Sequence, residues 1–250
     1  MAPIKLSWTL LSALLTTTAY AQSANPGIGK NPAAEGATED VTPGSGPNGS
    51  EEWFNTGLTD SGWNPPFLDF TTLYHISRDQ FYSGAGRSCA QYNDYFQRAG
   101  DSHGIDPAIL AFIAMQESSC NADAGGPTPG LMQVSCANYP NGQCTDSLDD
   151  NVNAGANYLR QQLDAYGNNA LLAIGSYNGW FPAGSGLNGN KGMTEGYPCS
   201  DEGRANGLPQ NLDYLQETLN GWFTGQDPYG DQSWIGTYNC QGQCGNGNKC

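Results

Sequence analysis

The sequence predicts a mainly α-helical fold with a small β element, which places it in the α+β class. Disulfides are expected to cross-link this fold. Three observations predict it. Apolar residues recur at helical spacing from about residue 89 to residue 224, a Gly- and Pro-rich stretch over residues 125–130 interrupts them, and the chain carries eight cysteines. A length of 250 residues suffices for one well-packed domain with additional segments, or for two small domains.

The N-terminal segment has the features of a secretory signal. Lys5 precedes a short apolar run that ends in Ala-Tyr-Ala, so residues 1–21 are expected to be removed by cleavage after Ala21. The run is too short and too rich in threonine to span a bilayer well, and no later segment is long enough. We therefore expect a secreted, extracellular protein with no membrane partner.

Two segments without helical periodicity follow the signal. Residues 22–50 are rich in Gly, Pro, Asn and Ser, which predicts a disordered linker or pro-segment. The sequence Asn-Gly-Ser beginning at Asn48 is a glycosylation sequon, which predicts a sugar on this segment. Residues 51–88 hold aromatic residues without a clear period and predict an irregular aromatic-rich layer packed on the domain. Stacking of sugars on Trp53 or Trp63 is the alternative to packing.

Five helices are expected in a domain that spans residues 89–224. They cover residues 88–100, 104–118, 147–167, 168–180 and 211–223. Asp106 is placed to cap the second helix, and Pro107 fits its first turn. Acidic residues begin the third helix and Gly167 ends it. Residues 225–250 form a Gly-rich tail with three cysteines, which predicts a stapled loop.

Cysteine usage and charge narrow the classes of function. An even number of cysteines behind a signal indicates about four disulfides in an oxidising compartment, with the connectivity left open. No CxxC pair occurs and His75 and His103 are the only histidines, so neither a metal ion nor a cofactor is expected. The formal charge of -15 disfavours nucleic acid as a partner, because phosphate binding needs clustered Lys and Arg. It also gives no long-range attraction to an anionic polymer.

Glu117 is the most informative single residue. It follows Ile109 and Ile113 at intervals of four, so its carboxyl group is expected to project from the apolar face of its helix. Apolar neighbours and the negative end of the helix dipole both disfavour the charged form and raise the pKa. A carboxyl group that keeps its proton near neutral pH can act as general acid at a glycosidic oxygen. The alternative is a glutamate at a helix end that turns to solvent.

Polar groups are also expected beside this helix end. The stretch GGPTPGLMQV predicts a strand or an extended turn whose apolar residues pack on the helices, while Gln133 points to the other face. Its amide would then be available for a sugar hydroxyl or acetamido group. Tyr177 and Asn178 follow an apolar stripe at the end of another helix. Taken singly, they are typical of a core tyrosine and a helix cap.

Four blocks in this order resemble a known family. The blocks are IDPAILAFIAMQESS, GLMQV, NVNAGANYLRQQL and LLAIGSYNGW, and they resemble the soluble lytic transglycosylases and their relatives, the goose-type lysozymes (glycoside hydrolase family 23). The resemblance covers about residues 90–223. It implies a lysozyme-like helical fold with a small β element and a long substrate cleft. It also implies cleavage of the β-1,4 bond between N-acetylmuramic acid and N-acetylglucosamine in peptidoglycan, by a lytic transglycosylase or a muramidase.

The resemblance implies roles for individual residues. Glu117 matches the single catalytic acid of the family, and residues 211–223 resemble its closing helix, with Tyr214 at the aromatic position. Five further residues match the family's motifs and are expected to contact the substrate: Ser118, Met132, Gln133, Tyr177 and Asn178.

Departures from the family pattern leave undecided whether the site has a second catalytic carboxylate. Ser135 stands where goose-type lysozymes have aspartate, and Gln210 and Asn211 stand where many transglycosylases have an acidic residue. Four aspartates are candidates for a second carboxylate, although none is placed by a motif: Asp123, Asp146, Asp149 and Asp150. Cys120 lies in the loop after Glu117, where a disulfide would fix that loop.

With one carboxylate, the N-acetyl oxygen of the substrate is expected to attack the anomeric carbon, an exception to the two-carboxylate scheme. Glu117 then acts as base on the sugar's 6-hydroxyl group, which closes a 1,6-anhydro ring by intramolecular attack. If water attacks instead, the enzyme is a muramidase. The alternatives are a chitin-cleaving enzyme of the same fold and a non-catalytic sugar-binding protein. A hydrolase with a cysteine nucleophile is disfavoured because all eight cysteines can pair. We expect a monomer whose partner is peptidoglycan glycan strands or chitin.

Overall fold

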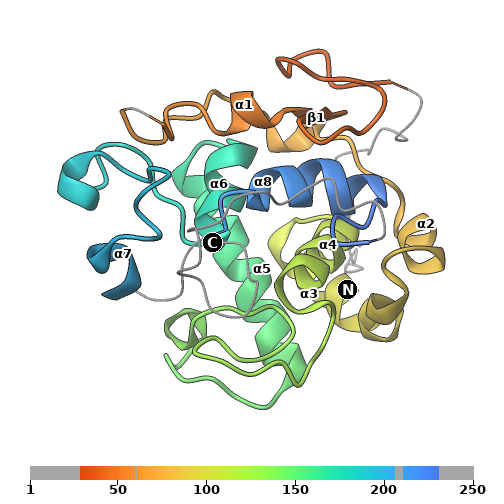
Figure 1. Cartoon of the computed structure of the whole chain (residues 1–250). Coiled ribbons are helices and arrows are strands. Elements are labelled where there is room, and N and C mark those ends of the chain that lie inside the picture. The colour runs from red at the N-terminus through yellow and green to blue at the C-terminus, as the bar shows by residue number, and fades with distance from the viewer. Residues whose placement is uncertain (1–28, 60, 206–210, 231–250) are drawn as a thin grey trace, which may run out of the picture.

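The computed structural model describes residues 29–59, 61–205 and 211–230 (Figure 1). The mainly α-helical class is confirmed, because helices and short helical turns dominate these residues and the β element is a two-stranded sheet. The predicted signal, residues 22–28, Gln210 and the last three cysteines lie outside the described residues. Within the described ranges, no helix has both the length and the hydropathy needed to cross a bilayer.

Three helices form the centre of the molecule. They are α3 (Asn93–His103), α4 (Pro107–Ser118) and α5 (Leu148–Ala165), and each packs against the other two. The first two turns of α4 are buried on every side, which explains why its sequence is apolar all round. Asp106 caps α4 by accepting the Ala108 N–H at 2.8 Å, as the sequence predicts. The expected helix over residues 88–100 is a 3-10 turn, η2 (Arg87–Tyr92), that leads into α3.

The prediction of one regular helix over residues 211–223 is wrong. This stretch consists of three short turns of different pitch: α8 (Tyr214–Gln216), a π-helical turn η5 (Glu217–Gly221) and a 3-10 turn η6 (Trp222–Thr224). We call these three turns the closing segment. The closing segment packs against α4 and against α6 (Ala170–Tyr177), which in turn packs on α5. Irregular turns of this kind are frequent at functional sites.

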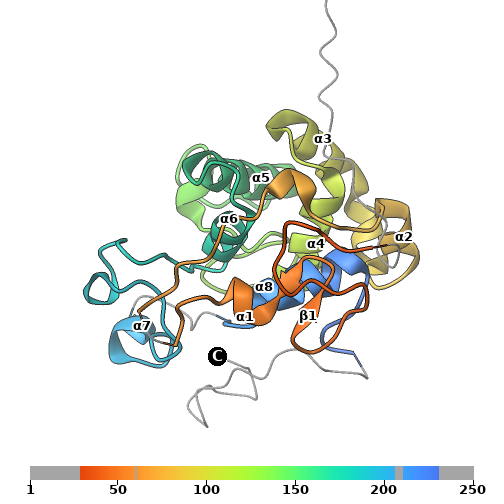
Figure 2. The same ribbon diagram turned by 90° about the horizontal axis from the view of Figure 1, so that it is seen from above.

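Several short elements complete the described chain. They are α1 (Glu51–Phe54), η1 (Phe70–Thr72), α2 (Arg78–Ser83), η3 (Cys136–Asn138), η4 (Asn188–Asn190) and α7 (Asp201–Ala205). Seen from above, the chain from β1 to α1 runs alongside α8 (Figure 2).

The expectation of disorder over residues 22–50 is wrong for residues 29–50. They fold into turns and an antiparallel hairpin of β1 (Ser45–Gly46) and β2 (Gly49–Ser50). Within the hairpin, Asn48 is fully buried and its side-chain amide donates to the Tyr74 carbonyl at 2.9 Å and to the Leu219 carbonyl at 2.6 Å. The expected sugar on Asn48 is therefore wrong for the folded protein, because this amide is sealed against the closing segment.

Residues 51–88 form the expected packed layer. Trp63 is fully buried, and its indole N–H donates to the Phe54 carbonyl at 2.9 Å. Its ring meets Trp180 edge to face at 4.9 Å and rests on Gly175 of α6, where a Cβ atom would lie 2.5 Å from the indole. Packing, and not sugar stacking, is thus the use of Trp63.

Disulfides staple the domain as expected. Cys89 is bonded to Cys120, and Cys136 is bonded to Cys144. Cys199 is disulfide-bonded as well. The first bridge joins η2 to the loop directly after α4, which is the loop that the sequence places next to Glu117.

Candidate active site

Glu117 lies in the last turn of α4, where the residue is half-buried and its carboxyl group is largely desolvated. Ile109 and Ile113, which share its face of the helix, are both buried. The hydroxyl group of Tyr214, from α8, donates a hydrogen bond to Glu117 Oε1. Desolvation by burial raises the pKa of Glu117 to about 8, and the hydrogen bond from Tyr214 acts in the opposite direction without cancelling it. The expected raised pKa is confirmed, and the alternative of a glutamate turned to solvent is wrong.

Part of the Glu117 surface nevertheless remains accessible. A carboxyl group that is protonated at neutral pH and still reachable from solvent can deliver a proton to a bound oxygen atom. The arrangement therefore has the chemistry of a general acid, with Tyr214 fixing the orientation of the carboxyl group.

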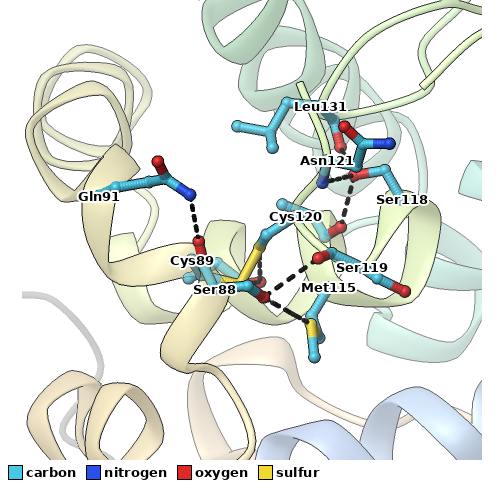
Figure 3. Close-up of a disulfide and its surroundings, with 11 residues drawn as sticks. Ser88, Cys89, Gln91, Met115, Ser118, Ser119, Cys120, Asn121 and Leu131 are labelled. Carbon is cyan, nitrogen blue, oxygen red and sulfur yellow. Dashed lines mark hydrogen bonds between the residues drawn. A yellow bond between two sulfur atoms is a disulfide. The ribbon is translucent and has the colours of Figure 1, made fainter. Parts of the chain in front are cut away.

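The loop after Glu117 is held in place by the Cys89–Cys120 disulfide and by serine hydroxyl groups (Figure 3). Ser118 Oγ lies 2.7 Å from the Leu131 carbonyl and accepts the Asn121 N–H at 3.1 Å. The predicted substrate-binding residue Ser118 is thus engaged in joining the end of α4 to the turn that contains Leu131.

The segment GLMQV is a turn and not a strand, so the second of the two expected forms is confirmed. Leu131 and Met132 are fully buried. Met132 is fully buried in the structure, and its expected contact with substrate stays a prediction. Gln133 is partly exposed, and its amide nitrogen donates to the Gly130 carbonyl at 2.8 Å.

Asn151, in the first turn of α5, holds this turn from below and was not singled out by the sequence. Its side-chain oxygen accepts the Met132 N–H at 2.9 Å, and its amide nitrogen donates to the Tyr139 hydroxyl at 2.6 Å and the Pro129 carbonyl at 3.2 Å. Gly130 is required beside it, because a Cβ atom there would lie 2.6 Å from the Asn151 amide nitrogen. A polar residue among the apolar positions of a helix is the only signal that points to Asn151.

The structure brings Tyr177 and Asn178 to the same region as Glu117. The Tyr177 hydroxyl donates to the Met132 carbonyl at 3.0 Å, and burial, followed by the charge of nearby Glu117, raises the pKa of Tyr177. Asn178 ends α6, as expected for a cap, and its side-chain oxygen accepts the Asn211 N–H at 2.9 Å. Asn178 is thereby bonded to the chain three residues before the closing segment begins.

Replacing Gly155 by alanine is expected to disturb this contact. A Cβ atom at Gly155, in α5, would lie 2.7 Å from the Tyr177 hydroxyl and 2.9 Å from Met132 Cβ, both of which sit in packed surroundings. We expect the free energy of unfolding to fall by roughly 1–3 kcal/mol, measured by denaturant titration. Gln161→Ala, at an exposed position of the same helix, is the control. An unchanged unfolding midpoint in Gly155→Ala would show that Tyr177 has room to move.

None of the four candidate aspartates contacts Glu117. Asp149 forms an ion pair with Arg98 at 2.5 Å, and Asp150 accepts the Thr145 hydroxyl at 2.9 Å. Asp123 and Asp146 line a groove of 380 Å³ whose lining does not include Glu117. The structure therefore does not bring these aspartates together with Glu117.

A different acidic residue, Glu217, lies next to the site, and the sequence patterns did not identify it as a candidate. It is fully buried in the π-helical turn, three residues after Tyr214. Its Oε2 atom accepts hydrogen bonds from Asn211 at 2.6 Å, Tyr229 at 2.5 Å and Gln116 at 2.9 Å. Burial raises the pKa of Glu217, whereas these three hydrogen bonds lower it. The sequence shows Glu217 as one polar residue of an amphipathic helix, and the widened turn that buries it leaves no sequence signal.

The fold and the site define a helical domain with a desolvated carboxyl group, on a partly exposed residue, at the end of its central helix. Residues 94–191 match the family described as "Transglycosylase SLT domain". This range contains Glu117, the GLMQV turn and the Tyr177–Asn178 pair, whereas Tyr214 and Glu217 lie beyond it. Residues 94–191 of this chain thus resemble a transglycosylase SLT domain.

Individual relatives match over part of their length. A transglycosylase of Enterobacteria phage PRD1 is 35% identical over 100 residues, which are 38% of this chain and 34% of the phage protein. The 70 kDa soluble lytic transglycosylase SLT70 of Escherichia coli is 24% identical, with a TM-score of 0.34, over 55% of this chain and 25% of that protein. An inactive mutant of the lytic transglycosylase Slt of Pseudomonas aeruginosa is 20% identical, with a TM-score of 0.31, over 57% and 26%. The chain spans about a third or less of these proteins.

Proposed function

We propose that this protein is a secreted enzyme that cleaves the β-1,4 bond between N-acetylmuramic acid and N-acetylglucosamine in peptidoglycan. The observation that carries the proposal is the carboxyl group of Glu117, desolvated, partly accessible and hydrogen-bonded to Tyr214. The resemblance to an SLT domain supports the reaction class. The predicted signal supports export, and the protein acts as a monomer on the glycan strands.

In the first step, Glu117 transfers its proton to the glycosidic oxygen while the C1–O bond of the muramic acid residue breaks. The acetamido oxygen of the same sugar attacks the anomeric carbon and forms a cyclic oxazolinium intermediate. The other sugar leaves with the proton as an alcohol. The raised pKa of Glu117 keeps the proton available for this step at neutral pH.

In the second step, the Glu117 carboxylate removes the proton of the sugar's 6-hydroxyl group. The 6-oxygen attacks the anomeric carbon, the oxazolinium ring opens, and a 1,6-anhydro product forms. Glu117 is thereby returned to its protonated state. The mechanism uses a single carboxyl group, that of Glu117, because the acetamido oxygen of the substrate takes the place of a second one.

The test is mass spectrometry of purified peptidoglycan after digestion with the wild-type protein, with the Glu117→Gln variant and chitin treated in parallel. We expect muropeptides one water lighter than the reducing forms, and no such products from the variant. Reducing products would assign a muramidase. Cleavage of chitin alone would mean that chitin, and not peptidoglycan, is the substrate. Binding without cleavage of either polymer would overturn the proposal in favour of a sugar-binding protein.

The dependence of activity on pH provides a second prediction. Because the first step needs protonated Glu117, and the pKa of Glu117 in the free protein is about 8, kcat/KM is expected to be sustained at neutral pH and to fall as pH rises through about 8. Initial rates of release of soluble muropeptides between pH 5 and pH 10 measure this profile. A fall of activity already near pH 5 on the alkaline side would contradict the assignment of Glu117 as the acid.

A further inference from the structure

Tyr229 presents an aromatic ring to solvent while its hydroxyl group is anchored in the protein. The residue is 51% exposed and is one of three large hydrophobic residues in the described ranges that are exposed, with Phe67 and Leu187. Its hydroxyl group donates to Glu217 Oε2 at 2.5 Å and accepts from the Gln116 amide nitrogen at 3.0 Å. A tyrosine held at its tip by two hydrogen bonds has lost the freedom to rotate away, although half of its surface faces water.

The hydrogen bond from the Tyr229 hydroxyl group helps to stabilise the buried carboxyl group of Glu217. A fully buried carboxyl group is costly unless its hydrogen bonds are satisfied, and three donors converge on Oε2 of Glu217 while its buried Oε1 has no hydrogen-bond partner. Two of these donors, Asn211 and Gln116, belong to the domain itself, and the third is the exposed tyrosine. Trp222 completes the arrangement, because its indole N–H donates to Gln116 at 2.6 Å and its ring lies 6.1 Å from that of Tyr229.

Tyr229 is connected to the general acid through two of its neighbours. Gln116, which bonds the Tyr229 hydroxyl, is the chain neighbour of Glu117. Tyr214, which bonds Glu117, is also near Tyr229: the pKa of Tyr214 is raised by burial, by Glu117 and, to a smaller extent, by Tyr229. Tyr229 lies beyond residues 94–191, so the family match does not assign it.

We propose that the ring of Tyr229 is a binding platform on which a sugar ring of the glycan strand stacks beside the bond that is cleaved. The inference rests on the proposed function of Glu117. A pyranose ring has a face made of C–H groups, and the face of an aromatic ring carries the partial negative charge that attracts them. The chain's strong net negative charge gives an acidic ligand no advantage here, whereas a neutral N-acetylglucosamine ring meets no repulsion. A ring already fixed by Glu217 and Gln116 loses little further freedom on binding.

The experiment compares two variants that both lack the hydroxyl group, Tyr229→Phe and Tyr229→Leu. Each variant removes the hydrogen bond to Glu217, so both lose the same stabilisation. The difference between their dissociation constants then measures the contribution of the aromatic ring. Both are made in the Glu117→Gln background, and the dissociation constant for the tetrasaccharide of N-acetylglucosamine is measured by calorimetry. Phe67→Leu removes a comparably exposed ring (59% against 51% for Tyr229) from the N-terminal layer and is the matched control.

We expect Tyr229→Leu to bind the tetrasaccharide roughly three- to tenfold more weakly than Tyr229→Phe, and Phe67→Leu to bind like its parent. In the catalytically intact background, Tyr229→Leu is expected to raise KM on peptidoglycan more than it lowers kcat. Equal affinities of Tyr229→Leu and Tyr229→Phe would overturn the platform while leaving the proposed function in place. Wild-type protein that binds the tetrasaccharide but releases no muropeptides would overturn the proposed function alone, because the binding comparison needs no cleavage.

Discussion

Replacing Glu117 by glutamine is expected to remove cleavage of peptidoglycan and, at the same time, to stabilise the folded protein at alkaline pH. Glutamine keeps the shape of the side chain and an oxygen atom that can accept the Tyr214 hydroxyl, but it has no proton to transfer. The rate of muropeptide release should fall by about a thousandfold or more, in line with the contribution of a positioned general acid. Loss of the reaction with retained binding of glycan would identify the role as chemical.

The effect on stability follows from the pKa of the same group. The pKa of Glu117 rises from 4.5 to about 8 on folding, so the folded state binds the proton more tightly than the unfolded state. Stability therefore decreases as pH rises from about 4.5 to about 8, and the glutamine variant lacks this loss. At pH 9 the variant should exceed the wild type in free energy of unfolding by as much as about 5 kcal/mol, since each pKa unit corresponds to about 1.4 kcal/mol, and at pH 4 the two should be alike.

Denaturant titrations at both pH values measure this difference. Glu52→Gln serves as the control, because Glu52 is exposed in α1 and its replacement should leave the free energy of unfolding unchanged. A glutamine variant at position 117 that is no more stable than the wild type at pH 9 would mean that the carboxyl group is better solvated than its surroundings indicate.

The second large effect is expected at Asn151, where alanine would remove three hydrogen bonds at once. The Met132 N–H would lose its acceptor inside the core, and the Tyr139 hydroxyl would lose its donor. We expect a loss of about 3 kcal/mol or more in the free energy of unfolding, because buried polar groups are left without partners. The turn that carries Gln133 should also loosen, so kcat should fall with stability.

Thermal unfolding followed by circular dichroism measures the first effect, and muropeptide release well below the unfolding temperature measures the second. Asn157→Ala is the matched control, because Asn157 is partly exposed on the same helix α5. If Asn151→Ala unfolded at the same temperature as Asn157→Ala, the turn would owe its conformation to Gly130 and not to Asn151.

The central part of the fold and the position of the acid follow from the sequence for a clear reason. Helical spacing records which residues face the core, so α4, its Asp106 cap and the apolar face that carries Glu117 are all visible in the chain. A carboxyl group on that face is a local property of one helix. Its raised pKa could be predicted before the neighbouring elements were known.

Other features depend on contacts that leave no periodic trace. The order of residues 29–50 rests on buried polar side chains such as Asn48 and Asn220, and a composition rich in Asn, Gly and Ser gives the same signal for such a segment as for a linker. Asn151 and Glu217 act through hydrogen bonds to distant parts of the chain. Asp123 and Asp146 were candidates by residue type alone, and they line a groove whose lining includes Gly130 and Asn151 but not Glu117.

The packing of the hairpin against the closing segment also affects how the protein folds. Asn48 and Asn220 are 172 residues apart, and the Tyr214–Glu117 hydrogen bond spans 97 residues. Contacts between such distant residues form late, because a long loop must close before they contribute. A ribosome-bound chain that ends before residue 214 has Glu117 but not the hydroxyl group that orients it. The acid therefore reaches its working geometry only when nearly the whole described chain has been synthesised, which limits the reactivity of partly made protein.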